Sequence, residues 1–195
     1  MPKLNTTTSG IITATLTADS SPTLELQQNG VAIRTLGESQ LVMGTAQSTA
    51  TGATLYDFSG IPSWAKRITV IMNGLSTSGT SALLVQIGDS GGIETTGYVS
   101  GVGVVGTSSA AGSSSTAGFL WSNNSVAAGT LSGTMTIQTP SLNVWVSSSA
   151  IGYSVNGGHF GGGNKTLSDT LTQVRVTTVN GTDTFDAGTV NIMWE

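Results

Sequence analysis

The hydrophobic residues of this chain recur at every second position in several short runs, and the pattern is clearest near the C-terminal end. In Thr189–Glu195, the side chains of Val190, Ile192 and Trp194 alternate with those of their neighbours. Because successive side chains of a β-strand point to opposite faces, this spacing predicts a strand with one apolar face. We expect it to be held between two neighbouring strands, since a chain end otherwise frays, with Trp194, Ile192 and Val190 as structural anchors.

Similar runs occur along most of the chain, and turn residues separate them. The dipeptide Asn29-Gly30 predicts a hairpin, and Asp186-Ala187-Gly188 predicts a turn before the last strand. The other strand-like runs are Leu24–Gln27, Val31–Leu36, Leu55–Phe58, Ile68–Leu75, Ser81–Ile87, Tyr98–Val104, Phe119–Trp121, Gly133–Gln138, Asn143–Ser149, Ala150–Ser154 and Leu171–Val179. From these runs and the C-terminal one we expect about nine to eleven strands and no significant helix, in an all-β, antiparallel β-sandwich of jelly-roll type.

Three regions lack the alternating pattern. Residues 1–21 are rich in Thr and Ser, which predicts an extended N-terminal arm, and Pro22 marks the start of a single β-sandwich domain, 22–195. Thr107–Thr116 is nearly all Ser, Ala and Gly, which indicates either a mobile surface loop or a segment ordered by a neighbouring subunit. Asn156–Asn164 is expected to be a further glycine-rich loop.

Composition excludes several classes of function. Charged residues make up only 8% of the chain, but hydrophobic residues make up 37%, so a core is expected rather than disorder. The six basic residues are scattered, which argues against a nucleic-acid-binding surface. The chain has no cysteine, no basic-then-apolar leader and no apolar run of membrane-spanning length. We therefore expect synthesis in the cytoplasm without a signal peptide, no membrane insertion and no cofactor.

One stretch imitates a catalytic motif. Gly88–Gly92 reads GDSGG, as around the nucleophile of trypsin-like proteases, and also fits G-x-S-x-G. A serine nucleophile needs a histidine base, and the single histidine, His159, follows Ser90 in the chain, against the trypsin-like and subtilisin-like orders. The α/β-hydrolase order is open through Asp89 or Glu94, but the following residues offer no helix for a nucleophile elbow. We predict a plain turn at a strand end and no catalytic residue.

Other polar and aromatic residues admit two interpretations. His159 lies among glycines, so it is expected to be exposed and uninvolved, unless a trimer axis gathers three copies. Asn180, Asp183 and Asp186 resemble a calcium loop, but their spacing fails the motif and turn formation explains them better, so no metal is expected. The four tryptophans, Trp64, Trp121, Trp145 and Trp194, are either sugar-stacking residues or core and interface anchors.

Several stretches taken in order resemble a family of tailed-bacteriophage virion proteins, which form the C-terminal region of tail fibres or other appendages. The similar stretches are Ile12–Ile33, Asp57–Gly74, Gln86–Gly97 and Arg175–Glu195. The resemblance covers most of the chain and is weakest over Val104–Ala128. It implies a β-sandwich, typically trimeric, on the outside of a phage particle, and it carries over no catalytic residue.

Three functional hypotheses follow. The first is a non-enzymatic virion structural protein, a homotrimeric appendage (capsid decoration, head spike or short tail fibre) attached to capsid or tail proteins through Ile11, Ile12 and Leu16. Only about twenty residues precede the domain, too few for a fibre shaft, which favours a compact appendage. The second is a host-receptor module that binds surface polysaccharide through Tyr98 and Trp121. The third is a hydrolase that uses Ser90, or paired acids acting on glycans.

Overall fold

The computed structural model describes residues 24–28, 31–36, 41–48, 52–106, 110–123, 126–127, 129–155 and 157–195. These residues form sixteen strands and no helix, which confirms the predicted all-β class. The strand count exceeds the predicted one partly because several strands have only two residues. The chain divides into two compact units between Glu38 and Ser39.

The first unit contains one described hairpin. Strands β1 (Leu24–Gln28) and β2 (Val31–Leu36) pair with each other in an antiparallel two-stranded sheet. Both strands agree with the sequence prediction, but the hairpin belongs to the first unit, so the expected domain boundary at Pro22 differs from the observed division. The predicted arm, with Ile11, Ile12 and Leu16, lies outside the described residues.

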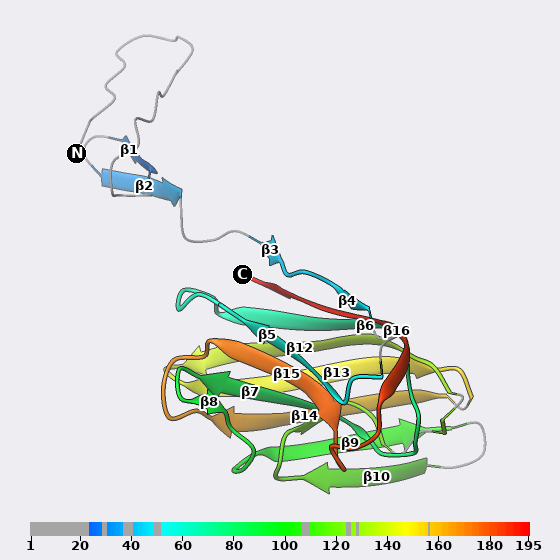
Figure 1. Cartoon of the computed structure of the whole chain (residues 1–195). Coiled ribbons are helices and arrows are strands. Elements are labelled where there is room, and N and C mark those ends of the chain that lie inside the picture. The colour runs from blue at the N-terminus through cyan, green and yellow to red at the C-terminus, as the bar shows by residue number, and fades with distance from the viewer. Residues whose placement is uncertain are drawn as a thin grey trace. The chain divides into compact units, whose positions relative to one another are not determined.

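The second unit is built from two antiparallel sheets, and in Figure 1 strands of the smaller sheet cross in front of the larger one. The strands of the larger sheet are β3 (Val42–Met43), β4 (Gln47–Ser48), β6 (Arg67–Thr77), β9 (Val99–Val105), β10 (Ala110–Ser115), β12 (Leu131–Ser141), β13 (Val144–Tyr153), β14 (Gly158–Thr166) and β16 (Phe185–Trp194). Their order is β10, β9, β14, β13, β12, β6, β16 and β3, and β4 also pairs with β16.

The smaller sheet has five strands. They are β5 (Leu55–Ser59), β7 (Leu83–Asp89), β8 (Gly92–Ile93), β11 (Phe119–Leu120) and β15 (Gln173–Thr178). Their order is β11, β7, β15 and β5, and β8 pairs with β7 as a hairpin. The two sheets form an antiparallel β-sandwich whose strand order is compatible with the jelly-roll type.

The core lies between the sheets because alternate residues of each strand face inward. In β5, Tyr56 and Phe58 are buried, whereas the residues between and beside them are exposed. The same alternation brings Val70 of β6 opposite Ile192 of β16. Both side chains are almost completely buried, which stabilises the fold by removing apolar surface from water.

The C-terminal strand is held between neighbours, as the sequence predicted. Strand β16 pairs with β6 on one side and with β3 and β4 on the other. Val190 and Ile192 are buried in the core, and Trp194 is partly buried against it. The predicted turn at Asp186–Gly188 is wrong, because these residues continue the strand through two bulges. Gly188 has φ +93°, and a Cβ there would meet the carbonyl oxygen of Gly74 at 2.4 Å.

Two segments predicted as loops are strands instead. Most of Asn156–Asn164 lies in β14, and Ala110–Ser115 of the Ser/Ala/Gly tract forms β10. In β14 the glycines reflect the close approach of neighbouring strands rather than a lack of structure. A Cβ on Gly163 would lie 2.2 Å from the carbonyl oxygen of Val99 on the adjacent strand, so only glycine fits there.

Candidate functional site: closed polar clusters and an uncharged sheet face

The GDSGG stretch forms the predicted turn at a strand end, between β7 and β8. Asp89 is buried, and its Oδ1 accepts a hydrogen bond from the backbone N–H of Gly91 at 2.8 Å. Ser90 is exposed at the tip of the turn. The Asp89 side chain therefore shapes the turn, as Asp residues commonly do in tight turns.

A polar cluster braces this turn against the neighbouring segments. The Ser168 hydroxyl lies 2.6 Å from Oδ2 of Asp89 and 2.9 Å from Oε1 of Glu94, and the Ser168 N–H donates to the same Glu94 oxygen at 2.8 Å. The Lys165 ammonium forms an ion pair with Glu94 and lies 5.4 Å from the centre of the Tyr98 ring. Lys165 is buried, and this pairing offsets the cost of burying its charge.

The contacts within the cluster keep both carboxyl groups ionised. The Ser168 hydroxyl and the Gly91 N–H lower the pKa of Asp89. Burial raises the pKa of Glu94, but the hydrogen bonds from Lys165 and Ser168 outweigh burial, so the net pKa is lowered. Two ionised carboxylates that are already hydrogen-bonded are poor proton donors, so the geometry describes a structural brace better than an acid–base pair.

His159 is not the exposed loop residue that the sequence predicted. It lies in β14 with 1% of its surface exposed, its Nδ1 accepts from the N–H of Asn123 at 3.1 Å, and its ring packs edge-on against Tyr153. A buried ring cannot meet its own copies at a trimer axis, so that interpretation is wrong as well. Burial lowers the pKa of His159, which keeps the imidazole neutral.

The strand that carries His159 also separates it from Ser90. Lys165, six positions further along β14, contacts Glu94 beside the GDSGG turn. Six residues of strand span about 20 Å, so the histidine lies at the far end of β14 from this cluster. Ser90 and His159 therefore do not form the nucleophile–base pair that the motif imitates.

His159 makes stability depend on pH, and we expect a fall in melting temperature between about pH 7 and pH 5. Its folded pKa lies below the ordinary histidine value of about 6.5, so the unfolded chain binds the proton more readily and stability is lost as pH drops. Carboxyl groups titrate near pH 4 and contribute little in this window. In His159→Gln an amide oxygen still accepts from Asn123 without titrating, so its melting temperature should stay nearly constant. Equal slopes in thermal unfolding of the two proteins would contradict this assignment.

The two aromatic residues proposed as glycan contacts are both buried. Trp121 is 0% exposed and Tyr98 1% exposed. The Tyr98 hydroxyl accepts from the N–H of Ile87 at 2.8 Å, and its ring packs edge-on against Phe119. Neither side chain can touch a ligand on the surface, so the prediction of a glycan site at these residues is wrong. Both residues serve the core instead.

The stretch that contains Asn180 and Asp183, which resembles a calcium-binding loop, forms a turn, as the sequence favoured. Oδ1 of Asp183 accepts from the Asn180 side chain at 2.7 Å, and Oδ2 accepts from the N–H of Ser81 at 2.9 Å. These bonds, chiefly the one from Asn180, lower the pKa of Asp183. Within the part of the chain that the structure describes, no three His, Cys, Asp or Glu side chains gather where they could hold a metal ion.

The broadest distinctive surface of the sandwich is the outer face of the larger sheet. Across β10, β9, β14, β13 and β12, every ionisable side chain points inward, and the outward positions are neutral. One row across these strands is entirely Ser, Gly and Thr; its members are Ser114, Gly101, Gly162, Ser148 and Thr136. We call the outward side of these five strands the neutral face.

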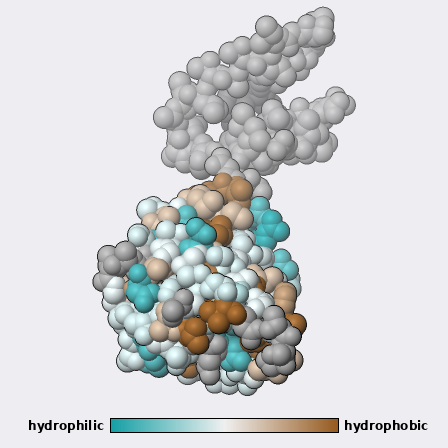
Figure 2. Space-filling view, turned by 90° about the vertical axis from the view of Figure 1, so that its right-hand side faces the viewer, coloured by the Kyte–Doolittle hydropathy of each residue, from teal (hydrophilic) through white to brown (hydrophobic). Residues whose placement is uncertain are grey.

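The neutral face also carries exposed apolar side chains. Val99 is 66% exposed, Val105 60% and Phe160 55%, and all three occupy outward positions of β9 or β14. The smaller sheet differs, because Asp57 and Arg175 form a two-bond ion pair on its outward side. In the view of Figure 2, the described surface is mostly of neutral hydropathy, with few strongly hydrophilic residues and some hydrophobic groups.

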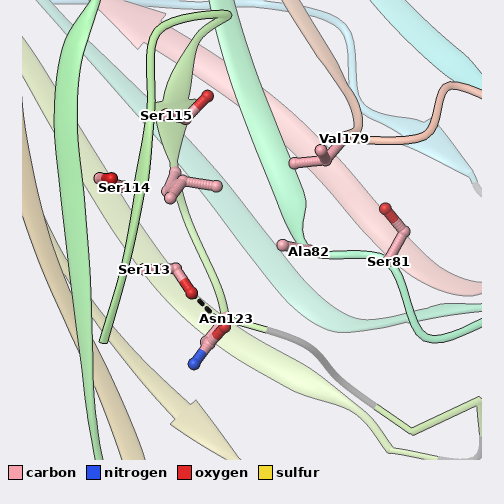
Figure 3. A pocket seen from close by; sticks show the side chains of 8 residues that line it. Ser81, Ala82, Ser113, Ser114, Ser115, Asn123 and Val179 are labelled. Atoms are coloured by element: carbon pink, nitrogen blue, oxygen red, sulfur yellow. Dashed lines mark hydrogen bonds between the residues drawn. The ribbon is translucent and has the colours of Figure 1, made fainter. Parts of the chain in front are cut away.

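The larger sheet ends at β10, beside a small hollow. A cavity of about 210 Å³ lies at this edge, and its lining residues are Ser81, Ala82, Ser113, Ser114, Ser115, Leu120, Asn123 and Val179. Figure 3 shows the β10 serines on one side of the hollow and Ala82, Ser81 and Val179 on the other. The Ser113 hydroxyl lies 2.8 Å from Oδ1 of Asn123, and this bond ties β10 to the segment that follows β11.

Comparison of the chain with protein-family models, with curated proteins and with solved structures finds no match in any of the three. Among the described residues, no helix is long and apolar enough to cross a membrane.

Sequence reasoning missed the neutral face, although a signal for it was present. The stretch from Thr95 to Asn164 contains no Lys, Arg, Asp or Glu, and it supplies four of the five strands and most of the fifth.

Proposed function

We propose that the protein is a non-enzymatic structural protein of a bacteriophage particle, a homotrimeric surface appendage whose subunits associate through the neutral face. The single observation that carries the proposal is this face, which is broad, uncharged and partly apolar. Surfaces of this kind mark association sites, because bringing them together desolvates no charge. The resemblance of several stretches to phage appendage proteins supplies the setting.

The size of the neutral face is close to the area that one subunit contributes to a standard interface. Strands lie about 4.8 Å apart and rise about 3.3 Å per residue, so the five strands, with six to eleven residues each, cover roughly 700 Å². Stable interfaces bury about 800 Å² on each partner. Three such faces can close around a threefold axis, each contacting both neighbours, which satisfies the closed symmetry that most homo-oligomers adopt.

The polar clusters support an assembly role over catalysis. The carboxylates of Asp89, Glu94 and Asp183 are engaged in bonds that hold turns, and His159 is buried away from Ser90. The alternative of a polysaccharide-binding module loses the aromatic contacts on which it was based, because Tyr98 and Trp121 lie in the core. Attachment to the particle is assigned to residues 1–21, as the sequence favours.

Light scattering and particle assembly test the proposal. The purified protein at micromolar concentration should show three times the mass of one chain. A chain lacking residues 1–21 should remain a trimer with an unchanged melting temperature, but should no longer be incorporated into particles. A stable monomer, or normal incorporation of the shortened chain, would overturn the corresponding part of the proposal.

A further inference from the structure

The large apolar side chains of the neutral face are concentrated on its three middle strands. Strands β9, β14 and β13 present outward valines and one phenylalanine, among them Val99, Phe160 and Val146. The outward residues that pair with them on the two flanking strands are small or polar: Ala110, Gly112 and Ser114 in β10, and Ser132, Thr134, Thr136, Gln138 and Ser141 in β12. An apolar centre with a polar rim is the usual arrangement of a contact between proteins.

Phe160 is the largest exposed apolar side chain of this face, and it stands on β14, the middle strand of the five. Its ring leans along the strand over Gly158, where a Cβ would lie only 3.3 Å from two of the ring carbons. The outward residues beside it on the adjacent strands are Gly103 and Ala150. Neither of these small neighbours shields the ring, which stays above the middle strand and is 55% exposed.

We propose that Phe160 lies on the threefold axis of the trimer, where three copies of its ring pack against one another. This inference rests on the proposed trimer, and it goes further by placing the axis along β14. When one face contacts both neighbouring subunits, the line that divides the two contacts faces the axis. With β14 on that line, β9 and β10 meet one neighbour, and β13 and β12 meet the other. The largest exposed apolar side chain then becomes the most deeply buried one.

The strands on either side of β14 are complementary in size under this arrangement. Around an axis parallel to the strands, the residues of one row lie at one height, so each outward residue of β9 meets the same row of a neighbour's β13. A smaller side chain faces a larger one in three rows, where the pairs are Gly101 with Ser148, Gly103 with Ala150, and Gly152 with Val105. In the remaining row two valines meet, so the flanks of the axis pack without charge.

Because the chain lacks cysteine, an engineered cysteine reports how close it lies to its own copies. The full-length Phe160→Cys protein is treated with a short bismaleimide and separated on a denaturing gel. We expect a strong band of two linked chains and none of three, because a two-armed reagent joins only two of the three thiols at one axis. The matched control is Thr134→Cys, in the same row but two strands away on β12, roughly 10 Å from β14. Its copies lie far apart, so it should remain a single-chain band.

Phe160→Ser tests the same contact by affinity. The side chain is exposed in a single subunit, so the melting temperature of the dissociated chain should not change. The concentration at which half of the trimer dissociates should rise at least about tenfold, as it does when a central aromatic anchor is lost. The control is Val179→Ser, which removes a side chain of similar exposure, 53%, outside the neutral face and should leave that concentration unchanged.

Each failure has a distinct meaning. A parent protein with the mass of one chain overturns the trimer and the axis together. If the parent is a trimer that Ser148→Glu dissociates, but Phe160→Cys gives no linked pair, the neutral face remains the contact and only the axis is wrong. A linked pair from Thr134→Cys moves the axis to the rim of the face and overturns the inference as well.

Discussion

Replacing Trp121 with alanine should lower the free energy of unfolding by about 3–5 kcal/mol, the range for truncating a buried aromatic residue. The side chain is completely buried in the main core cluster. The backbone N–H of Trp121 donates to the carbonyl of Leu83, which holds the chain beside β7. Alanine leaves a large void between sheets that cannot collapse, because the surrounding strands are locked by hydrogen bonds. A domain of ordinary stability, about 5–15 kcal/mol, would lose a large fraction of it.

Two further variants make the Trp121 experiment specific. Trp121→Phe should cost less, because it fills most of the void and removes an indole N–H that has no hydrogen-bond partner among the described residues. Trp194→Ala should also cost less, because Trp194 is only partly buried against the core. The measurement is denaturant unfolding at one protein concentration. A Trp121→Ala protein as stable as the parent would show that the residue is peripheral and would reopen the glycan interpretation.

The strands with alternating apolar residues were predictable from the sequence, because burial of one face imposes that pattern. Val190 and Ile192 in β16, and Tyr56 and Phe58 in β5, follow it directly. The inward direction of Tyr98 was not predictable from its neighbours, which are Gly97 and Val99. Its burial depends on backbone groups of Ile87 and Glu94 that fold over its hydroxyl, and a single sequence does not reveal such long-range partners.

The glycine-rich strands failed prediction for a different reason. Glycine lowers intrinsic strand preference, so β14 resembles a loop when read alone. Its glycines allow its neighbours to approach closely, as at Gly161, where a Cβ would lie 3.1 Å from the carbonyl oxygens of both Gly101 and Leu120. The lack of charge from Thr95 to Asn164 was visible in the sequence, but which residues face outward was known only once the register was established.

Ser148→Glu should convert the proposed trimer into monomers without unfolding the sandwich. Ser148 lies in the middle of the neutral face, exposed on β13 between Gly162 and Thr136. In the proposed assembly, the substitution buries a carboxylate on each of three subunits, with no cation on that face to pair with it. The effective penalty is several kcal/mol per buried ion, and the three like charges around one axis repel each other as well.

The expected result is a shift in light scattering from three chain masses to one at micromolar concentration, with unchanged far-ultraviolet circular dichroism. The control is Ser63→Glu, which adds the same charge at an exposed turn outside the neutral face and should leave the mass unchanged. Raising the salt concentration should restore little association in Ser148→Glu, because screening weakens repulsion but does not remove the desolvation cost of a buried carboxylate. If Ser148→Glu retains the mass of the parent protein, the neutral face is not the subunit contact, and association must use another surface.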